Sequence, residues 1–196
     1  TVSPFEGEGS GLGLSLLACR EYLQQPFVFM SCDTLTDEAV PAPSENWMGF
    51  AEVDDILAYR TVSVDAEDVV AICEKGEGVP ATHKPYIGLA GVHDFAAFWA
   101  SMEQGGATAI DTGEAHGLRA LVKAGIKAKR FTWYDTGNPP ALARAREHFR
   151  EPDEPSILDK ANEAIWFVDG AVIKFSDDEK FIANRIKRVA ELEGYV

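Results

Sequence analysis

The chain has 196 residues, 46% of them hydrophobic and 10% aromatic, which is the composition of a folded globular protein and excludes a disordered one. Its 32 acidic and 18 basic residues give a formal net charge of −14. We therefore expect neither nucleic acid nor an anionic membrane as a partner, because both are bound through basic surfaces, whereas small phosphorylated ligands held by a divalent cation remain compatible with this charge.

Cysteines and apolar segments bear on where the protein works. Cys19, Cys32 and Cys73 are odd in number, share no metal-type spacing, and each lies in an apolar or strand-like run, where a buried reduced thiol is the usual state. We therefore expect a reducing compartment, the cytoplasm. Charged residues interrupt the longest apolar stretches within about ten residues, so neither a membrane-spanning segment nor a signal peptide is expected. A homo-oligomer is compatible with the sequence.

The first part of the chain alternates helical patterns with short apolar runs. After the glycine-rich residues 6–13, apolar residues at i, i+3 and i+4 predict a helix over 14–23. Runs rich in β-branched and aromatic residues then predict strands at 27–32, 47–50, 58–64 and 68–73.

The same alternation continues to residue 149. The predicted elements are, in order, a strand at 84–91, helices at 95–104 and 114–124, a strand at 127–134 and a helix at 141–149. Asp94 is the expected N-cap of the first of these helices, and Gly125 ends the second. Because strands that alternate with helices favour a layered α/β architecture, we predict one domain over 1–150 with a mixed, mainly parallel sheet of Rossmann-like type.

The pattern changes after residue 150. Residues 151–156 form a polar linker. Two short strands within 164–175 enclose Asp169-Gly170, a pair typical of hairpin turns, and apolar periodicity predicts a helix over 181–193. We therefore expect 157–196 to form a small β-hairpin followed by a helix.

Two predicted strands end in an aspartate that is followed by a threonine. Asp33 follows the apolar strand that begins at Phe27, and Asp135 follows the strand that contains Trp133. If both strands lie in one sheet, the two carboxylates emerge at its ligand-binding edge and offer the hard oxygen ligands that Mg²⁺ requires beside phosphates. The alternative is that Asp33 caps the following turn and Asp135 starts a β-turn before Pro139.

The order of these motifs resembles that of sugar-nucleotide-type nucleotidyltransferases. A glycine-led helix is followed by a strand ending in aspartate, a strand ending in Glu-Lys, a strand containing glycine, and a Trp-x-Asp-Thr-Gly element. In this chain the motifs are Asp33, Glu74-Lys75, Gly88 and Trp133–Gly137, and the resemblance covers residues 6–149. It implies an α/β nucleotidyltransferase fold and a reaction of a nucleoside triphosphate with a sugar phosphate or a small phosphorylated head group.

The resemblance also implies roles for individual residues. Asp33 and Asp135 would hold Mg²⁺ at the phosphates, and Lys75 would neutralise the phosphate of the attacking substrate. Glu74 would contact its sugar or head group, with a solvated charge pair at the strand end as the alternative reading of Glu74-Lys75. Asp33, Lys75 and Asp135 are thus the candidate catalytic residues.

Three further residues are candidates for substrate binding. By the same resemblance, Gly11 would let the backbone approach the nucleotide base, and Gly88 would line the acceptor pocket. For Gly11 the alternative is an ordinary glycine in a loop that enters a helix. Glu114, at the start of a predicted helix, is a candidate to reach the acceptor pocket, with helix capping as the alternative.

The chain departs from the family pattern at its start. The Gly-x-Gly-Thr-Arg type loop that binds the triphosphate, and the Pro-Lys element after it, are not in the sequence, and Gly9–Gly13 has no following basic residue. The sequence begins at Thr1 and looks like a nucleotidyltransferase without its first βαβ portion. Two expectations follow: a truncated enzyme, or a domain that lacks the triphosphate-binding loop.

The tail shows a second resemblance. Val172–Phe175 and the helix after it look like the opening of a choline-kinase or aminoglycoside-phosphotransferase lobe. This resemblance implies that Lys174 meets ATP phosphates and that Glu179 or Glu191 pairs with it. The alternative is a hairpin and helix that close the first domain.

Three hypotheses about function follow. The first is a Mg²⁺-dependent nucleotidyltransferase that activates a phosphorylated sugar or small alcohol for capsule or surface-glycan assembly. The second is a non-catalytic nucleotide-sugar-binding or regulatory module. The third is the N-terminal part of a small-molecule kinase.

Overall fold

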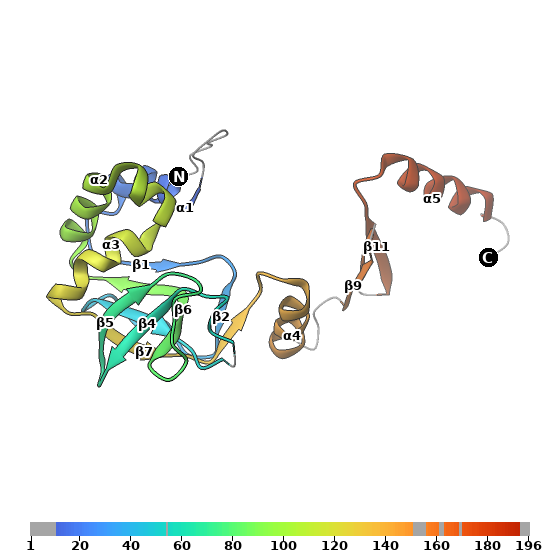
Figure 1. The fold of residues 1–196 in the computed structure, drawn as a ribbon. Coiled ribbons are helices and arrows are strands. Elements are labelled where there is room, and N and C mark those ends of the chain that lie inside the picture. Colours follow the sequence, from blue (N-terminus) through green and yellow to red (C-terminus); the bar gives the residue numbers. More distant parts are fainter. Residues whose placement is uncertain (1–10, 54, 151–155, 161–162, 169, 193–196) are drawn as a thin grey trace. The chain divides into compact units, whose positions relative to one another are not determined.

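The chain forms two compact units, Thr1–Ala145 and Arg146–Val196 (Figure 1). The structure is a computed structural model, and it describes residues 11–53, 55–150, 156–160, 163–168 and 170–192.

The first unit is built on a six-stranded sheet with the order β1-β6-β3-β7-β5-β4. Its strands are, in chain order, β1 (Phe27–Met30), β3 (Trp47–Phe50), β4 (Thr61–Asp65), β5 (Asp68–Cys73), β6 (His83–Val92) and β7 (Lys127–Arg130). An additional pairing of β4 with β6 closes the sheet on itself. Among the described strands of this sheet, β3 and β7 pair in parallel and the other pairs are antiparallel.

The sheet is mixed, as expected, but the expectation that it is mainly parallel is wrong. β4 and β5 are joined by the two residues Ala66 and Glu67, with Asp65 opposite Asp68, and Ala66 has a left-handed φ of 53°. A two-residue turn of this kind joins only antiparallel strands. β3 and β7 can be parallel because residues 51–126 lie between them in the chain and supply the long crossover that a parallel pair needs.

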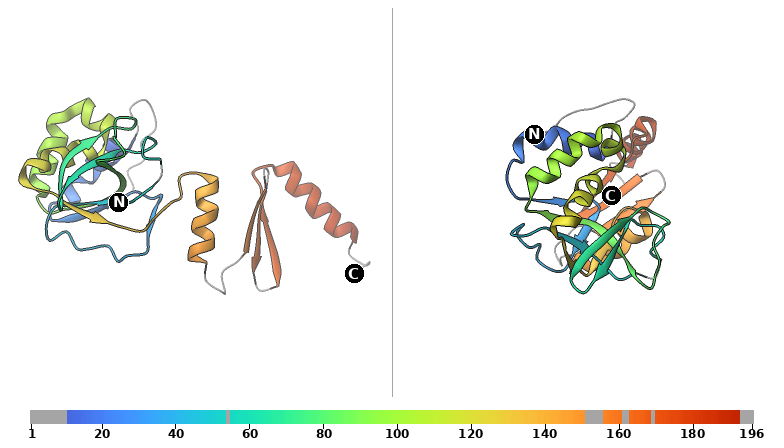
Figure 2. Two further views of the ribbon diagram at one scale, coloured as in Figure 1. Left: turned by 60° about the horizontal axis from the view of Figure 1, so that its bottom comes forward. Right: turned by 60° about the vertical axis from the view of Figure 1, so that its left-hand side comes forward.

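Three helices lie together on one side of this sheet, as the two further views in Figure 2 also show. They are α1 (Leu12–Cys19), α2 (Phe95–Thr112) and α3 (Glu114–Leu121). The helix predicted at 95–104 therefore continues to Thr112, with a non-helical residue at Gly106. Asp94 occupies the N-cap position of α2, but its carboxylate accepts a hydrogen bond from the Asn46 side chain and makes no capping bond.

Aromatic packing joins the helices to the sheet. Phe27 of β1 lies 5.5 Å, centroid to centroid, from both Phe98 and Trp99 of α2. On the other face of β3 and β6, a second buried cluster contains Trp47, Ala51, Ile87, Leu89 and Phe131. Both faces of the central strands are therefore buried, which explains why their sequences are nearly continuous apolar runs.

The strand predicted at 127–134 is divided in two. β7 ends at Arg130, and β8 (Trp133–Asp135) pairs antiparallel with β2 (Thr34–Thr36) in a separate two-stranded ribbon. The main chain leaves the sheet at Thr132, whose N–H and hydroxyl both donate to the Glu38 carboxylate instead of to a neighbouring strand. This division places Asp135 beside β2.

The cysteines are free, but they are not buried as expected: Cys32 is exposed, and Cys19 and Cys73 are half-buried. Within the described residues, no helix combines the length and the apolar character needed to cross a bilayer.

The second unit contains a three-stranded antiparallel sheet with the order β11-β10-β9, followed by α5 (Glu179–Leu192). The strands are β9 (Ser156–Lys160), β10 (Glu163–Val168) and β11 (Ala171–Phe175). β9 was not predicted, and it begins at Ser156, the last residue of the predicted linker. Val168 lies opposite Ala171 across the predicted turn, of which Asp169 lies outside the described residues.

We expect Gly91→Ala to destabilise the first unit. A Cβ at Gly91 would lie 2.0 Å from Nε1 of Trp47, which is fully buried, so the indole has to shift in a packed core. Overpacking of this kind costs about 2 kcal/mol of the free energy of unfolding, which urea denaturation measures.

The matched control for this substitution is Gly11→Ala. No described heavy atom lies within 4 Å of a Cβ at Gly11, so the free energy of unfolding should change by less than about 0.5 kcal/mol. Equal stability of the two variants would contradict the packing described for Gly91.

Candidate functional site

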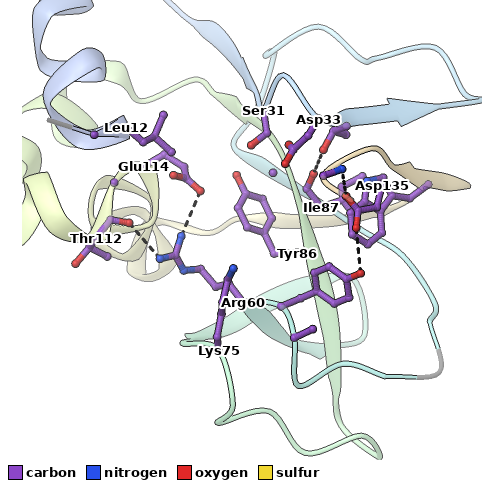
Figure 3. Close-up of a pocket in the computed structure, with 18 of the residues that line it drawn as sticks. Leu12, Ser31, Asp33, Arg60, Lys75, Tyr86, Ile87, Thr112, Glu114 and Asp135 are labelled. Carbon is purple, nitrogen blue, oxygen red and sulfur yellow. Dashed lines mark hydrogen bonds and ion pairs between the residues drawn. The ribbon is translucent and has the colours of Figure 1, made fainter. Parts of the chain in front are cut away.

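A cavity of about 630 Å³ opens in the first unit between the sheet, the two-stranded ribbon and the helices (Figure 3). Six of the residues predicted from the sequence line it: Gly11, Asp33, Lys75, Gly88, Glu114 and Asp135. Two others do not: Glu74 is not among the lining residues, and Lys174 belongs to the second unit. Residues that are far apart in the sequence are thus gathered around one space.

The two predicted metal-binding aspartates lie side by side because of the ribbon register. Thr34 pairs with Asp135, and the Asp33 carbonyl accepts a hydrogen bond of 2.9 Å from the Thr136 N–H. The buried Thr34 hydroxyl donates to the Ile87 carbonyl and so fastens the ribbon to β6. The aspartates therefore meet across two antiparallel strands, and not at the edge of a parallel sheet as predicted.

Both carboxylates face the space next to Gly137. A Cβ on Gly137 would lie 3.1 Å from Oδ1 of Asp135 and 3.3 Å from Oδ2 of Asp33. Oxygens from two side chains thus border one small volume that a side chain at Gly137 would fill.

Asp135 also makes the turn contacts that the alternative reading predicted. Its Oδ1 accepts a hydrogen bond from the Gly137 N–H at 2.8 Å. Its Oδ2 accepts from the Tyr59 hydroxyl and from the Asn138 side chain, both at 3.3 Å. Burial and the charge of Asp135 raise the pKa of Tyr59, so the phenol stays protonated as a donor. These bonds hold the Asp135 carboxylate in one orientation, which suits a turn and a metal ligand equally.

Asp33 is less constrained. It is exposed, and its carboxylate has no hydrogen bond or ion pair with any described residue. No group of three or more His, Cys, Asp or Glu side chains that could hold a metal occurs in the part of the chain that the structure describes. The pair fits Mg²⁺ in its usual substrate-assisted form, in which one or two carboxylates, water and phosphate oxygens complete the coordination shell. It does not fit a closed structural metal site.

Lys75 supplies a positive charge to the cavity. It follows β5, is exposed, and forms no ion pair with another described residue. An ammonium group that no carboxylate neutralises is available to an anionic ligand.

Glu74, the neighbour of Lys75, is held between two arginines. Nε and Nη2 of Arg60 donate to its Oε2 at 3.2 and 3.1 Å, and Arg119 donates to its Oε1. Burial works to raise the pKa of Glu74, but the guanidinium groups of Arg119 and Arg60 outweigh it and hold the pKa below its ordinary value. Both carboxylate oxygens of Glu74 therefore already have hydrogen-bond partners.

Glu114 is the carboxylate at the buried end of the cavity. It is the first residue of α3 and only 3% exposed, and its Oε1 accepts a hydrogen bond of 3.4 Å from Nη1 of Arg60. Burial raises the pKa of Glu114 even though the Arg60 charge works to lower it. Figure 3 shows its side chain and that of Tyr86 pointing toward one another from opposite sides of the cavity.

The two predicted glycines line the cavity for different reasons. Gly88 has a left-handed φ of 69°, and a Cβ there would lie 2.3 Å from the Ser31 hydroxyl oxygen, so both its conformation and the approach of Ser31 require glycine. Gly11 has open space where a side chain would be, in agreement with its alternative reading as an ordinary helix-entry residue.

Lys174 lies on β11 in the second unit, where its predicted partner is wrong. Its ammonium lies 3.8 Å from the buried Glu163 of β10, and Glu191 instead pairs with Lys187 at 3.9 Å. The register explains this: Lys174 lies opposite Ile165, which is two residues from Glu163 on β10 and therefore on the same face of the strand.

Sequence reasoning missed Tyr59, Arg60 and Tyr86, which also line the cavity. One signal was present: Arg60 is the only basic residue between Arg20 and Lys75, a stretch rich in acidic residues. A lone cation in such a stretch is a candidate for a buried ion-pair partner. Tyr86, inside an apolar strand, gave no such signal.

Glu114 and Glu74 should affect the pH dependence of stability with opposite signs. The raised pKa of Glu114 means that its contribution to stability is full below pH 4.5 and is lost as the pH rises through the folded-state value. The lowered pKa of Glu74 means that its contribution is present above pH 4.5 and is lost as the pH falls through the folded-state value.

Urea unfolding of both glutamine variants from about pH 3 to pH 8 tests this expectation. Relative to wild type, Glu114→Gln should gain stability as the pH rises past 4.5. Glu74→Gln should lose relative stability as the pH rises toward 4.5, and by less, because Glu74 is more exposed. Parallel curves for the two variants would contradict the electrostatics described.

No protein-family model matches the chain, and no curated protein matches it in sequence. Solved structures do match. One is described as a glucose-1-phosphate thymidylyltransferase from Bacillus anthracis in complex with sucrose, with a TM-score of 0.61, 15% identity, and coverage of 74% of this chain and 63% of that one.

Another is the inositol-1-phosphate CTP transferase from T. maritima, with a TM-score of 0.50, 16% identity, and coverage of 70% of this chain and 60% of that one. The chain thus spans less than two thirds of either of these structures. At these identities the likeness concerns the fold: this chain has a mixed α/β fold like that of sugar nucleotidyltransferases.

Proposed function

We propose that this chain carries the metal-binding and acceptor-binding side of a nucleotidyl-transfer site. The observation that carries the proposal is the convergence of Asp33 and Asp135 on one small volume, in the same cavity as Lys75, which has no ion-pair partner among the described residues. Two carboxylates and a free ammonium are suited to a Mg²⁺-bound phosphate and to a second phosphate beside it. The fold, which is like that of sugar nucleotidyltransferases, supports this reading.

The proposed reaction joins a phosphate monoester to a nucleoside triphosphate. A phosphate oxygen of the acceptor attacks the α-phosphorus, the bond from that phosphorus to the bridging oxygen of the β-phosphate breaks, and pyrophosphate leaves with that oxygen. Mg²⁺, when bound, supplies charge neutralisation at the phosphates. No protein nucleophile is required, so the site contributes alignment and electrostatics.

Each residue of the cavity has a defined task in this reaction. Asp33 and Asp135 would hold the cation, and the hydrogen bond from Tyr59 keeps the Asp135 carboxylate oriented. Lys75 would bind the acceptor phosphate and offset its charge. Glu114 would face the remainder of the acceptor. We extend the proposal to a cytoplasmic enzyme that activates a sugar or small alcohol for capsule or surface-glycan assembly.

Substitution of the two aspartates tests the metal pair. Asp33→Asn and Asp135→Asn keep the size of the side chains. At position 135 the amide oxygen can accept from the Gly137 N–H while the amide nitrogen donates to the Tyr59 hydroxyl, so the fold should persist. We expect Mg²⁺-dependent binding of nucleoside triphosphates, measured by calorimetry with CTP, UTP, dTTP and GTP, to weaken by roughly 100-fold or more, since even groups that only support metal ligands contribute up to that much.

Two further variants sharpen this test. Gly137→Ala keeps both carboxylates but fills the space between them, and it should weaken Mg²⁺-dependent binding too. Asp65→Asn, in the exposed β4–β5 turn, is the matched control and should bind as wild type does. Binding that needs no Mg²⁺, or that Asp33→Asn and Asp135→Asn leave unchanged, would overturn the metal pair. Mg²⁺-dependent binding without pyrophosphate release would instead favour the non-catalytic module.

Lys75→Gln tests whether Lys75 binds the phosphate group of the acceptor. Removal of the unpaired ammonium should lower the affinity for glucose 1-phosphate by about tenfold, the scale of one charge-assisted contact, and leave the stability unchanged. Lys84→Gln is the control, because Lys84 pairs with Glu52 at 2.8 Å and does not line the cavity. Equal affinities for the two variants would remove Lys75 from the site.

A further inference from the structure

Two buried polar atoms at the inner end of the cavity have no partner. The Tyr86 hydroxyl and Oε2 of Glu114 are both without a hydrogen bond among the described residues. Their residues line the cavity and are only 5% and 3% exposed. A buried polar group without a partner costs about 1–3 kcal/mol, so two of them at one end of a cavity point to a ligand that bonds to both.

The charges of four linked side chains cancel at this end of the cavity, which Lys75 and Asp111 also line. Arg60 and Arg119 carry two positive charges, and Glu74 and Glu114 carry two negative ones, linked by the hydrogen bonds described above. Arg60 is further satisfied by a bond of 3.1 Å to the Thr112 carbonyl. Glu114 therefore already has a cationic partner, and its second oxygen needs a hydrogen-bond donor but no further charge.

The two unpartnered atoms differ in what they need. Oε2 of an ionised Glu114 accepts only, so it requires a donor, whereas the Tyr86 hydroxyl can donate and accept. Burial and the charge of Glu114 raise the pKa of Tyr86 well above its ordinary value, so the phenol keeps its proton. An alcohol hydroxyl matches both, since it donates to the carboxylate and accepts from the phenol.

We propose that Tyr86 and Glu114 bind a hydroxyl group of a polyhydroxylated acceptor, a sugar phosphate or cyclitol phosphate, and so select it over a quaternary ammonium head group. This inference rests on the proposed function of the cavity. A trimethylammonium group has no hydrogen to donate and would leave both atoms unpartnered. Glu74, the carboxylate that the sequence suggested for this contact, has both oxygens bonded to arginines and lies outside the lining.

The experiment compares probes that share a phosphate and differ in the head group. Calorimetry measures the affinity of wild type for glucose 1-phosphate, mannose 1-phosphate, myo-inositol 1-phosphate, phosphocholine and inorganic phosphate. We expect at least one of the hydroxylated probes to bind about tenfold more tightly than phosphocholine, the value of one well-formed hydrogen bond in a buried site.

Tyr86→Phe separates binding from folding. The lost hydroxyl has no partner among the described residues, so the melting temperature should stay the same or rise, while the preferred hydroxylated probe should bind about tenfold more weakly. Phosphocholine and inorganic phosphate should bind as they do to wild type. Tyr22→Phe, at an exposed tyrosine outside the cavity, is the matched control and should change nothing. Glu114→Gln should lose affinity for the same probe as Tyr86→Phe does.

The outcomes distinguish this inference from the function on which it rests. Hydroxylated probes that bind equally to wild type and Tyr86→Phe, or more weakly than phosphocholine, would overturn the inference while Lys75 and the aspartates keep their roles. A wild-type chain that binds none of the hydroxylated probes also overturns it. Failure of the Mg²⁺-dependent nucleotide binding would overturn the proposed function, whatever the head-group preference.

Discussion

The Arg60 guanidinium holds together the parts of the first unit that form the cavity. It bonds to Glu74 after β5, to the Thr112 carbonyl at the end of α2 and to Glu114 at the start of α3. The main-chain carbonyl of Arg60 accepts a hydrogen bond of 2.9 Å from the main-chain N–H of Tyr86 in β6. One residue thus joins two strands to two helices. Because its side chain is largely buried, carboxylates must lie beside it, and the position of Glu114 follows from that requirement.

The two parts of the cavity differ in how their charges are paired. Near Arg60, the charges of two arginines and two glutamates cancel, and the Tyr86 hydroxyl and Oε2 of Glu114 have no hydrogen bond to a described residue. Near the ribbon, Asp33 and Asp135 are not paired with a basic residue in the described chain. Lys75, which Figure 3 shows beside Arg60, forms no ion pair with a described acidic residue. In a chain of net charge −14, two adjacent carboxylates attract a cation, while an unpaired lysine attracts an anion. A phosphate ester with a divalent cation suits both the carboxylates and the lysine, and an alcohol group on the ester suits Tyr86 and Glu114.

The sequence identified most elements but not how they pair. Periodicity located β3, β5 and α3 closely, because both length and burial pattern are local properties. Strand direction is not local, and the two residues between β4 and β5, Ala66-Glu67, lack the Asn-Gly or Asp-Gly signature of a tight turn, so the antiparallel sheet went unrecognised. Tyr86 was missed because a tyrosine in an apolar strand resembles any other core residue until its hydroxyl is found without a partner.

The prediction that Asp33 and Asp135 lie close together is right, but the strand arrangement it assumed is wrong. It assumed two neighbouring strands of a parallel sheet, whereas the carboxylates meet because Thr34 pairs with Asp135 in a ribbon outside the main sheet. A one-residue slip of that register would turn the Asp135 side chain to the opposite face of the ribbon. The buried bond from Thr34 to Ile87 resists such a slip, since it anchors β2 to a strand that is packed on both faces. The position of the aspartate pair therefore depends on Thr34, which bears no charge. In the Asp33-Thr34 sequence the threonine fixes the register and the aspartate supplies the carboxylate.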